Sequence, residues 1–368
     1  MKRLLALLLL GAAATLFGGD EKSSNAIVKL LNSRAAGSPN AYEAAAKIVL
    51  ADAEAGQVVQ QFLIALVAAD PDAPDVARIG EAKRRKFLAA SRERIREMAE
   101  IRDNPLAWYL LSLESNDRAM LRRAAAGGNV QALNAHGTII LTDALQNALI
   151  TSNELARAES EAYKSFKWAS DQGDANGLYN LGMCLMSGYG CRKDEQKAFE
   201  CFRTAAEAGH PEAINNLGGF FRDGIVVRPN QQVAVVWFKK SAELGNTFGT
   251  LNYALALLAG DGVAKNEKGA VKLLRFLSEK RKNAEAMNVY GMCFRNGIGV
   301  EADDREAFKW FEKSAAGGFA MAMDNLAACY ERGMGVEEDI RKSMWWKMKA
   351  RAAMGDRNAA EWLEKEKK

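Results

Sequence analysis

The residues that most often do chemistry in proteins are few in this chain. Its 368 residues include only two histidines, His136 and His210, and five cysteines. The sequence has no His-Glu-x-x-His zinc motif, no Ser-x-x-Lys or Gly-x-Ser-x-Gly nucleophile motif, and no Gly-Lys-Ser or Gly-Lys-Thr phosphate loop. We therefore predict no catalytic residue, no metal site and no cofactor.

One set of polar residues recurs at regular spacing. Asn180, Asn216 and Asn252 follow one another at steps of 36 residues, and Asn325 continues the series after a break at Val289. An amide side chain both donates and accepts hydrogen bonds, which suits contact with a peptide backbone. The alternative is that each amide bonds a group of its own or the next repeat, because buried polar groups are usually satisfied within the protein. Both interpretations stay open at this point.

The asparagine spacing belongs to a repeat that covers much of the chain. Phrases such as "YNLGMCLMSGYG" and "NNLGGFFRDG" recur, each after a glycine that follows a run of small residues. We take that glycine as the anchor of its repeat. Successive anchors are 36, 36, 37, 36 and 37 residues apart, after one earlier step of 45, and they are Gly128, Gly173, Gly209, Gly245, Lys282, Gly318 and Gly355. A period in the thirties is typical of a helical solenoid.

Each repeat predicts a hairpin of two helices, which we term helix A and helix B. Four residues after the anchor every copy has Ala or Gly, and eight residues after it stands Leu, Tyr or His. These offsets lie on one face of an α-helix. A second set of glycines ends helix A, because glycine readily adopts the left-handed turn at a helix C-terminus: Gly188, Gly224, Gly260, Gly297 and Gly333. Helix B then runs to the next anchor.

These segments resemble a known repeat family. "KAFECFRTAAEAGHPEAINNLGGFFRDG" and "EAFKWFEKSAAGGFAMAMDNLAACYERGMGV" are similar to Sel-one-like repeats, relatives of the tetratricopeptide hairpin, over about residues 118–363. The resemblance implies an all-α, right-handed α-solenoid whose concave groove the asparagines line, and a role as an adaptor in protein assembly. We expect residues 20–117 to be a degenerate helical extension and residues 118–368 to be the solenoid with a C-terminal capping helix.

Three positions depart from the repeat. Lys282 replaces an anchor glycine, where a left-handed backbone would cost a non-glycine residue about 1 kcal/mol. The copy anchored at Gly128 has Asp143 where helix A should end, and nine extra residues follow. Glu364 occupies a normally small core position, as expected of a polar terminal cap.

The repeat positions also give structural roles to the histidines and cysteines. His136 stands in the Leu/Tyr position, so we expect a packed core side chain, and His210 follows an anchor, where a polar side chain caps helix A. Three cysteines share one position in different repeats, about 10 Å apart at the usual helix spacing, which is too far for a disulfide: Cys184, Cys293 and Cys329. Cys191 and Cys201 are the pair that could form one, and this pairing stays open.

The N-terminus has the layout of a signal peptide. Lys2 and Arg3 precede an apolar run from residue 4 to 17 and then small residues, so we expect residues 1–19 to be a leader, cut after Ala14 or near Gly18. The alternative is a first helix buried in the core. No later segment is apolar enough to cross a membrane, which predicts an exported bacterial protein, periplasmic or secreted.

Charge and composition narrow the partner class. The net charge is +4 for the chain, and +2 without Lys2 and Arg3, which does not suggest nucleic-acid binding. We therefore expect a non-enzymatic adaptor that binds another protein or peptide through its groove. The alternatives are an envelope enzyme, such as a cell-wall-peptide or β-lactamase-like hydrolase, and a structural spacer. The oligomeric state does not follow from the sequence.

Overall fold

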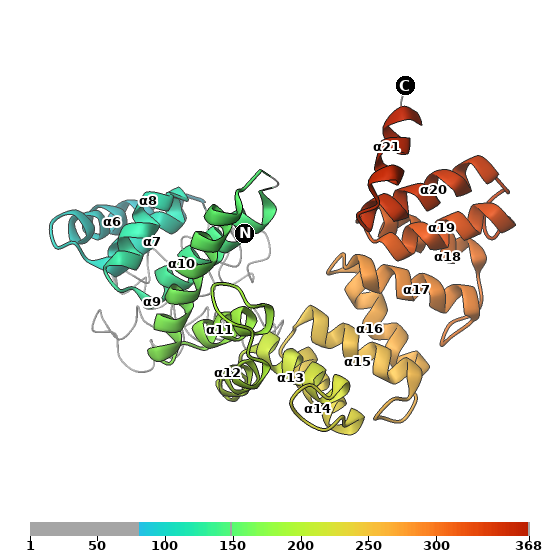
Figure 1. Cartoon of the computed structure of the whole chain (residues 1–368), viewed down its shortest axis with the longest axis horizontal. Helices are drawn as coiled ribbons and strands as arrows, with labels where there is room; N and C mark the ends of the chain where they lie inside the picture. Colours follow the sequence, from blue (N-terminus) through green and yellow to red (C-terminus); the bar gives the residue numbers. More distant parts are fainter. Residues whose placement is uncertain (1–80, 148, 367–368) are drawn as a thin grey trace. The chain divides into compact units, whose positions relative to one another are not determined.

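The part of the chain that the structure describes is built of α-helices. A computed structural model describes residues 81–147 and 149–366, where the helices follow one another in tandem and no strand is present (Figure 1). The all-α prediction is therefore confirmed. The predicted leader, residues 1–19, and the predicted extension up to residue 80 lie outside the described residues.

The described residues fall into two compact units. Unit 1 extends to Arg228 and also includes Leu244–Asn246, whereas unit 2 contains Pro229–Glu243 and the chain from Thr247 on. Unit 1 holds α6 Glu81–Glu100, α7 Pro105–Ser115, α8 Arg118–Ala126, α9 Val130–Gln146, α10 Ser152–Asp171, α11 Ala175–Ser187, α12 Glu195–Glu207 and α13 Pro211–Asp223. Unit 2 holds α14 Gln231–Glu243, α15 Thr247–Ala259, α16 Glu267–Glu279, α17 Ala284–Asn296, α18 Asp304–Ala316, α19 Ala320–Arg332, α20 Ile340–Ala353 and α21 Arg357–Glu366.

The predicted helices A and B are present as regular hairpins. The A helices α11, α13, α15, α17 and α19 each have 13 residues, and so do the B helices α12, α14, α16 and α18. Within each unit, every helix packs mainly against the next one along the chain. Stacked hairpins of this kind bury apolar faces that a single hairpin would leave in water.

The residue after the anchor begins helix A by capping it. The side-chain oxygens of Asn129, Asp174 and Asn283 accept from the backbone N–H three residues on, at 2.8, 2.8 and 2.7 Å. His210 does the same with Nδ1, 3.3 Å from the Ala213 nitrogen. The predicted capping role of this position is confirmed for these four residues.

Glycines end the helices as the sequence predicts. The anchors Gly128, Gly173, Gly209, Gly245, Gly318 and Gly355 have φ between 76° and 94°, and the glycines that end helix A, Gly188, Gly224, Gly260, Gly297 and Gly333, have φ between 65° and 79°. Lys282 takes the anchor conformation without being glycine, at φ 53°.

A further glycine in the turn brings helix A of one repeat against an earlier B helix, a contact that we call the glycine seat. A Cβ on Gly190, Gly262, Gly299 or Gly335 would lie 2.1–2.7 Å from a backbone oxygen of that helix. The oxygens belong to Glu159, Gln231, Glu267 and Asp304. In these four repeats only a residue without a side chain permits this approach. Val226 takes the same position in one repeat, at a φ of 68° that strains a β-branched residue.

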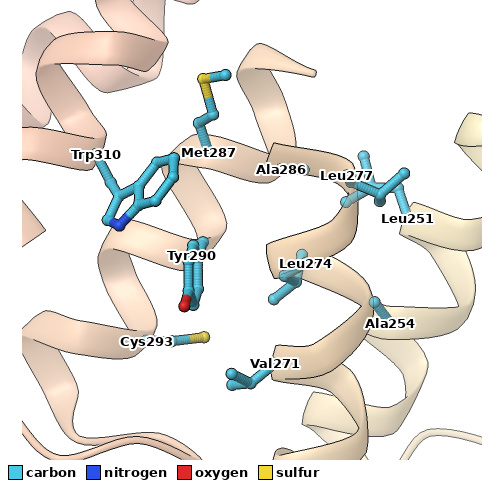
Figure 2. Packing of buried hydrophobic residues seen from close by; sticks show 10 residues of the cluster. All are labelled: Leu251, Ala254, Val271, Leu274, Leu277, Ala286, Met287, Tyr290, Cys293 and Trp310. Atoms are coloured by element: carbon cyan, nitrogen blue, oxygen red, sulfur yellow. The ribbon is translucent and has the colours of Figure 1, made fainter. Parts of the chain in front are cut away.

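The core of unit 2 shows how successive hairpins pack. Tyr290 and Cys293 from α17 face Leu274 and Val271 from α16, and all four are buried (Figure 2). Trp310 from α18 lies beside Tyr290, with ring centroids 5.1 Å apart. The small residues four positions after the anchors are also buried, as predicted: Ala132, Gly177, Ala213, Gly249, Ala286, Ala322 and Ala359.

The hairpin with the insertion departs from the others in length. Helix α9 has 17 residues and α10 has 20, against 13 in the regular A and B helices. Asp143, expected at the end of helix A, therefore lies inside α9, and that expectation was wrong. Without a glycine at this position the helix continues to Gln146, and the inserted residues lengthen both helices.

Candidate functional site

The recurring asparagines lie on one side of the A helices. Asn180 and Asn216 belong to α11 and α13 of unit 1, whereas Asn252 and Asn325 belong to α15 and α19 of unit 2. All four are half-buried. In unit 1 the Asn216 amide nitrogen lies 3.6 Å from the sulfur of Met183, which is a weak acceptor. For Asn180, Asn216 and Asn252, both interpretations of the series stay open.

Asn325 takes part in a network between helices. Its Nδ2 donates to Oδ1 of Asn288 on α17 at 2.8 Å, and its Oδ1 accepts from Nη1 of Arg295 at 3.2 Å. Asn288 is only 2% exposed. Asn325 therefore helps to join two repeats. This agrees with the interpretation in which the amides bond groups within the protein. The sequence reasoning missed Asn288, although it directly precedes Val289, the residue that breaks the asparagine series.

Exposed apolar side chains accompany the asparagines. Met183 follows Asn180 by three residues, and Phe248 and Met321 precede Asn252 and Asn325 by four, which places each pair on the same side of its helix. These three apolar side chains are 38%, 59% and 61% exposed. We call the stripe at three, seven and ten residues after the anchor the A face. On α15, α17 and α19 of unit 2 it contains Phe248, Asn252, Leu255, Glu285, Val289, Met292, Met321, Asn325 and Ala328.

The A face of unit 2 combines apolar groups with a few polar ones. Leu255 and Met292 are half-buried beside the exposed Phe248 and Met321. Next to the stripe, burial raises the pKa of the Asp324 carboxyl, and the Lys347 ammonium opposes this shift. Large apolar side chains in water with amides between them can hold a peptide through both side-chain and backbone contacts. Phe248 and Met321 were not predicted, because exposed apolar residues do not stand out in the sequence from those that form the core.

His210 is part of a buried polar contact in unit 1. Its Nε2 lies 3.1 Å from Oδ1 of Asn176, its ring stacks on Tyr179 with centroids 4.6 Å apart, and the Glu212 carboxylate lies 3.4 Å from Nδ1. Because Nδ1 accepts the capping bond, the ring proton belongs on Nε2. Burial lowers the pKa of His210 to about 4, so the ring is neutral at physiological pH. This arrangement fits a helix cap and not a general base.

His136 is buried as predicted, at 9% exposed, but it also lines a cavity. Burial lowers the pKa of this imidazole, and Arg122 acts in the same direction, while Glu161 opposes it. The cavity lies between α8 and α9, next to the lengthened part of α9. The sequence signal for it was the insertion together with a histidine in a Leu/Tyr position.

The five cysteines are free thiols. Cys191 and Cys201, whose pairing the sequence leaves open, are not bridged in this structure. Cys191 lies in the turn after α11 and points back at that helix, where its sulfur is 3.5 Å from the carbonyl oxygen of Cys184. Burial raises the pKa of Cys184 to about 12, and it raises the pKa values of Cys293 and Cys329 to about 11. These three thiols are buried, as predicted, and are not activated as nucleophiles.

The described residues contain neither a cluster of potential metal ligands nor a helix that could span a membrane. No three His, Cys, Asp or Glu side chains are grouped closely enough to hold a metal ion. Within residues 81–366, no helix has both the length and the apolar character needed to span a bilayer.

Five consecutive segments of the chain match the Sel1 repeat: residues 175–210, 211–246, 249–280, 284–319 and 320–346. The first four each begin at or near the start of a helix A and end close to the following anchor. Residues 175–346 are Sel1 repeats. The recognised family is thus confirmed, over a shorter range than the 118–363 expected from the sequence phrases. Sel1-repeat proteins are generally scaffolds for protein interaction.

Solved structures agree with this assignment. A Sel1 repeat protein from Oxalobacter formigenes is 26% identical with a TM-score of 0.58, over 67% of this chain and 96% of the other. The protective antigen c5321 of uropathogenic Escherichia coli, which has an SLR fold, is 23% identical with a TM-score of 0.52, over 86% of this chain and 66% of the other. The second likeness concerns the fold alone. A search of curated proteins gave no match.

Proposed function

We propose that this Sel1-repeat protein is a non-enzymatic adaptor that binds a peptide segment of a partner protein on the A face of unit 2. The observation that carries this proposal is the exposure of two large apolar side chains on the A face, Phe248 and Met321. Large apolar side chains that stay in water cost free energy, and at binding surfaces their burial by a partner recovers it. The family supports protein interaction as the general role, and the exposed apolar side chains support the A face as the surface that we propose for it.

Two exposed side chains give a direct test. The partner is first identified by pull-down from the envelope extract of the native host, and its affinity for purified variants is then measured by calorimetry. The double variant Phe248→Ser/Met321→Ser should weaken binding at least tenfold, because truncation of an anchoring apolar side chain costs more than about 1 kcal/mol. Its melting temperature should hardly change, since both side chains are mainly in water.

The matched control lies on a B helix. Val236 on α14 is 65% exposed, so Val236→Ser removes a similarly exposed apolar group away from the A face. This control should leave the affinity unchanged. If the double variant and the control bind equally well, the A face is not the binding surface.

An adaptor, a hydrolase and a spacer would behave differently toward cell-wall material and partner proteins. A hydrolase acting on wall peptide would alter isolated cell-wall material, and a pure spacer would neither alter it nor retain a specific partner. Release of peptide from purified wall material by the isolated protein would overturn the non-enzymatic assignment.

We further propose that the adaptor is exported, on the basis of the leader-like residues 1–19. Protein purified from its own host should then begin after residue 14. N-terminal sequencing tests this directly, and a mature chain that starts at Met1 or Lys2 would contradict it.

A further inference from the structure

The lengthened hairpin of unit 1 carries a cavity that the A face does not explain. The cavity has a volume of about 320 Å³, at the small end of the range for ligand sites. Its apolar wall includes Leu121 on α8 and Ile139 and Ile140 on α9, with Ile150 from the segment after α9. Asp143, Ala144 and Asn147 add the part of the wall that lies beyond the end of a regular helix A. The insertion therefore helps to form the cavity.

Among the residues that line the cavity, two arginines and one aspartate leave one positive charge in excess, while Glu161 acts on His136 from outside the lining. Arg118 and Asp143 form an ion pair with each other. Arg122 also lines the cavity, and among the residues that the structure describes it has no ion pair. His136 adds a ring nitrogen that can donate or accept a hydrogen bond. An anion is thus the ligand that this set of groups would attract.

We propose that this cavity binds a carboxylate that carries an aliphatic group, with Arg122 as the main contact of the carboxylate. A guanidinium can bind a carboxylate through two parallel hydrogen bonds, which makes it well suited to this role. The isoleucines and Leu121 surround the aliphatic group. Two sources share this chemistry: the C-terminus of a peptide that ends in an aliphatic residue, and a small aliphatic acid.

The position of His136 supports a ligand site over a packing defect. Other repeats place Leu or Tyr at this point of helix A, and Leu181, Leu217, Tyr290 and Leu326 are buried there. At the same position of α9, His136 adds a polar ring to a lining that also includes Leu121 and Arg122. The proposal stands independently of the A face, because the cavity is formed by α8, α9 and the segment that follows.

The chain's two histidines make the test specific. The full-length protein is labelled at histidine, and the ring signals are followed by NMR while a probe is added. The probes are N-acetyl-Ala-Leu with a free carboxylate, the same dipeptide as its C-terminal amide, and hexanoate. We expect the signals of His136 to shift in a saturable way with a carboxylate probe, and those of His210, at the start of α13, to stay in place. The amide should bind at least tenfold more weakly.

Two arginine variants locate the contact. Arg122→Gln should weaken binding of the carboxylate at least tenfold, whereas Arg203→Gln removes the same charge from α12, away from the cavity, and should have no effect. Circular dichroism confirms that both variants are folded. Tighter binding of the dipeptide than of hexanoate identifies a peptide C-terminus as the source, and the reverse order identifies a small acid. An unmoved His136 signal, equal binding of acid and amide, or full affinity in Arg122→Gln would each overturn the proposal.

Discussion

His210 couples the stability of unit 1 to pH. Its pKa is lowered from 6.5 to about 4 in the folded protein, so the unfolded chain binds a proton first as the pH falls. The stabilisation from the neutral ring is therefore complete above pH 6.5 and is lost as the pH falls from about 6.5 to 4. The total loss is roughly 3 kcal/mol, at about 1.4 kcal/mol for each pH unit of pKa shift.

The variant His210→Asn isolates this effect. Asparagine caps helix A in the same position of other repeats, as Asn129 and Asn283 do, but it does not titrate. Urea unfolding between pH 7 and 4 should show a smaller loss of stability for the variant than for the natural protein. Parallel curves would mean that the histidine proton has no part in the acid sensitivity.

Two glycines within A helices should respond to alanine in opposite directions. A Cβ at Gly177 would lie 2.7 Å from backbone atoms of Ala169 and Ser170, whereas one at Gly219 would meet nothing within 4 Å. Gly177→Ala should therefore destabilise the protein by about 1–3 kcal/mol through overpacking. Gly219→Ala should stabilise it by up to about 1 kcal/mol, because alanine favours the helix. Denaturant midpoints measure both, and equal effects would disprove the close approach at Gly177.

Lys282 should tolerate glycine better than an anchor glycine tolerates lysine. It holds a φ of 53° with an exposed side chain, so Lys282→Gly should be neutral or stabilising by up to about 1 kcal/mol. Gly209 has φ 85° and open space around it, so Gly209→Lys changes the backbone preference without a clash and should destabilise. Thermal melts of the two variants test the pair. A clear loss of stability in Lys282→Gly would contradict the strain at this anchor.

At the scale of the helix, the sequence predicts the regular hairpins well and the irregular one poorly. The anchor and stop glycines mark helix ends directly, because their left-handed conformations are rare for other residues. The same logic failed at Asp143, where the missing glycine meant a longer helix and not a differently capped one. A single glycine is enough to predict where a helix ends. Where such a glycine is missing, the length of the helix depends on the residues that it packs against.

The candidate site was harder to predict than the helices that carry it. The spacing identified the A face through its asparagines, but whether an amide faces water or a neighbour depends on side chains one repeat away. Asn325 shows this, because Asn288 and Arg295, 37 and 30 residues earlier in the chain, occupy both of its polar atoms. The cavity at His136 could likewise not be predicted, because it depends on where α8 lies, and the spacing of residues within α9 does not give that position.

Across the whole molecule, stability should be uneven along the chain. Helix α17 has six buried residues between its neighbouring helices, whereas Ala359 is the one buried residue of α21, which packs against α20. Local opening costs least where few apolar contacts are lost. Hydrogen exchange followed by mass spectrometry should show α21 exchanging at least tenfold faster than α17. Equal protection would mean that the stack opens as one cooperative body.

The glycine seats have a consequence for how the repeats can change over time. In each seat a glycine contacts main-chain atoms of an earlier B helix. The contact therefore restricts which residue can stand at the glycine position, but not the side chain of the B-helix residue. The B-helix residue can therefore vary, and in the four seats it is Glu159, Gln231, Glu267 or Asp304. A side chain added at Gly262 could not be offset by shortening Gln231, since the atoms in the way are backbone atoms. Contacts between two side chains should produce paired substitutions among relatives. The glycine seats should not, because only one of the two residues contributes a constraint on its side chain.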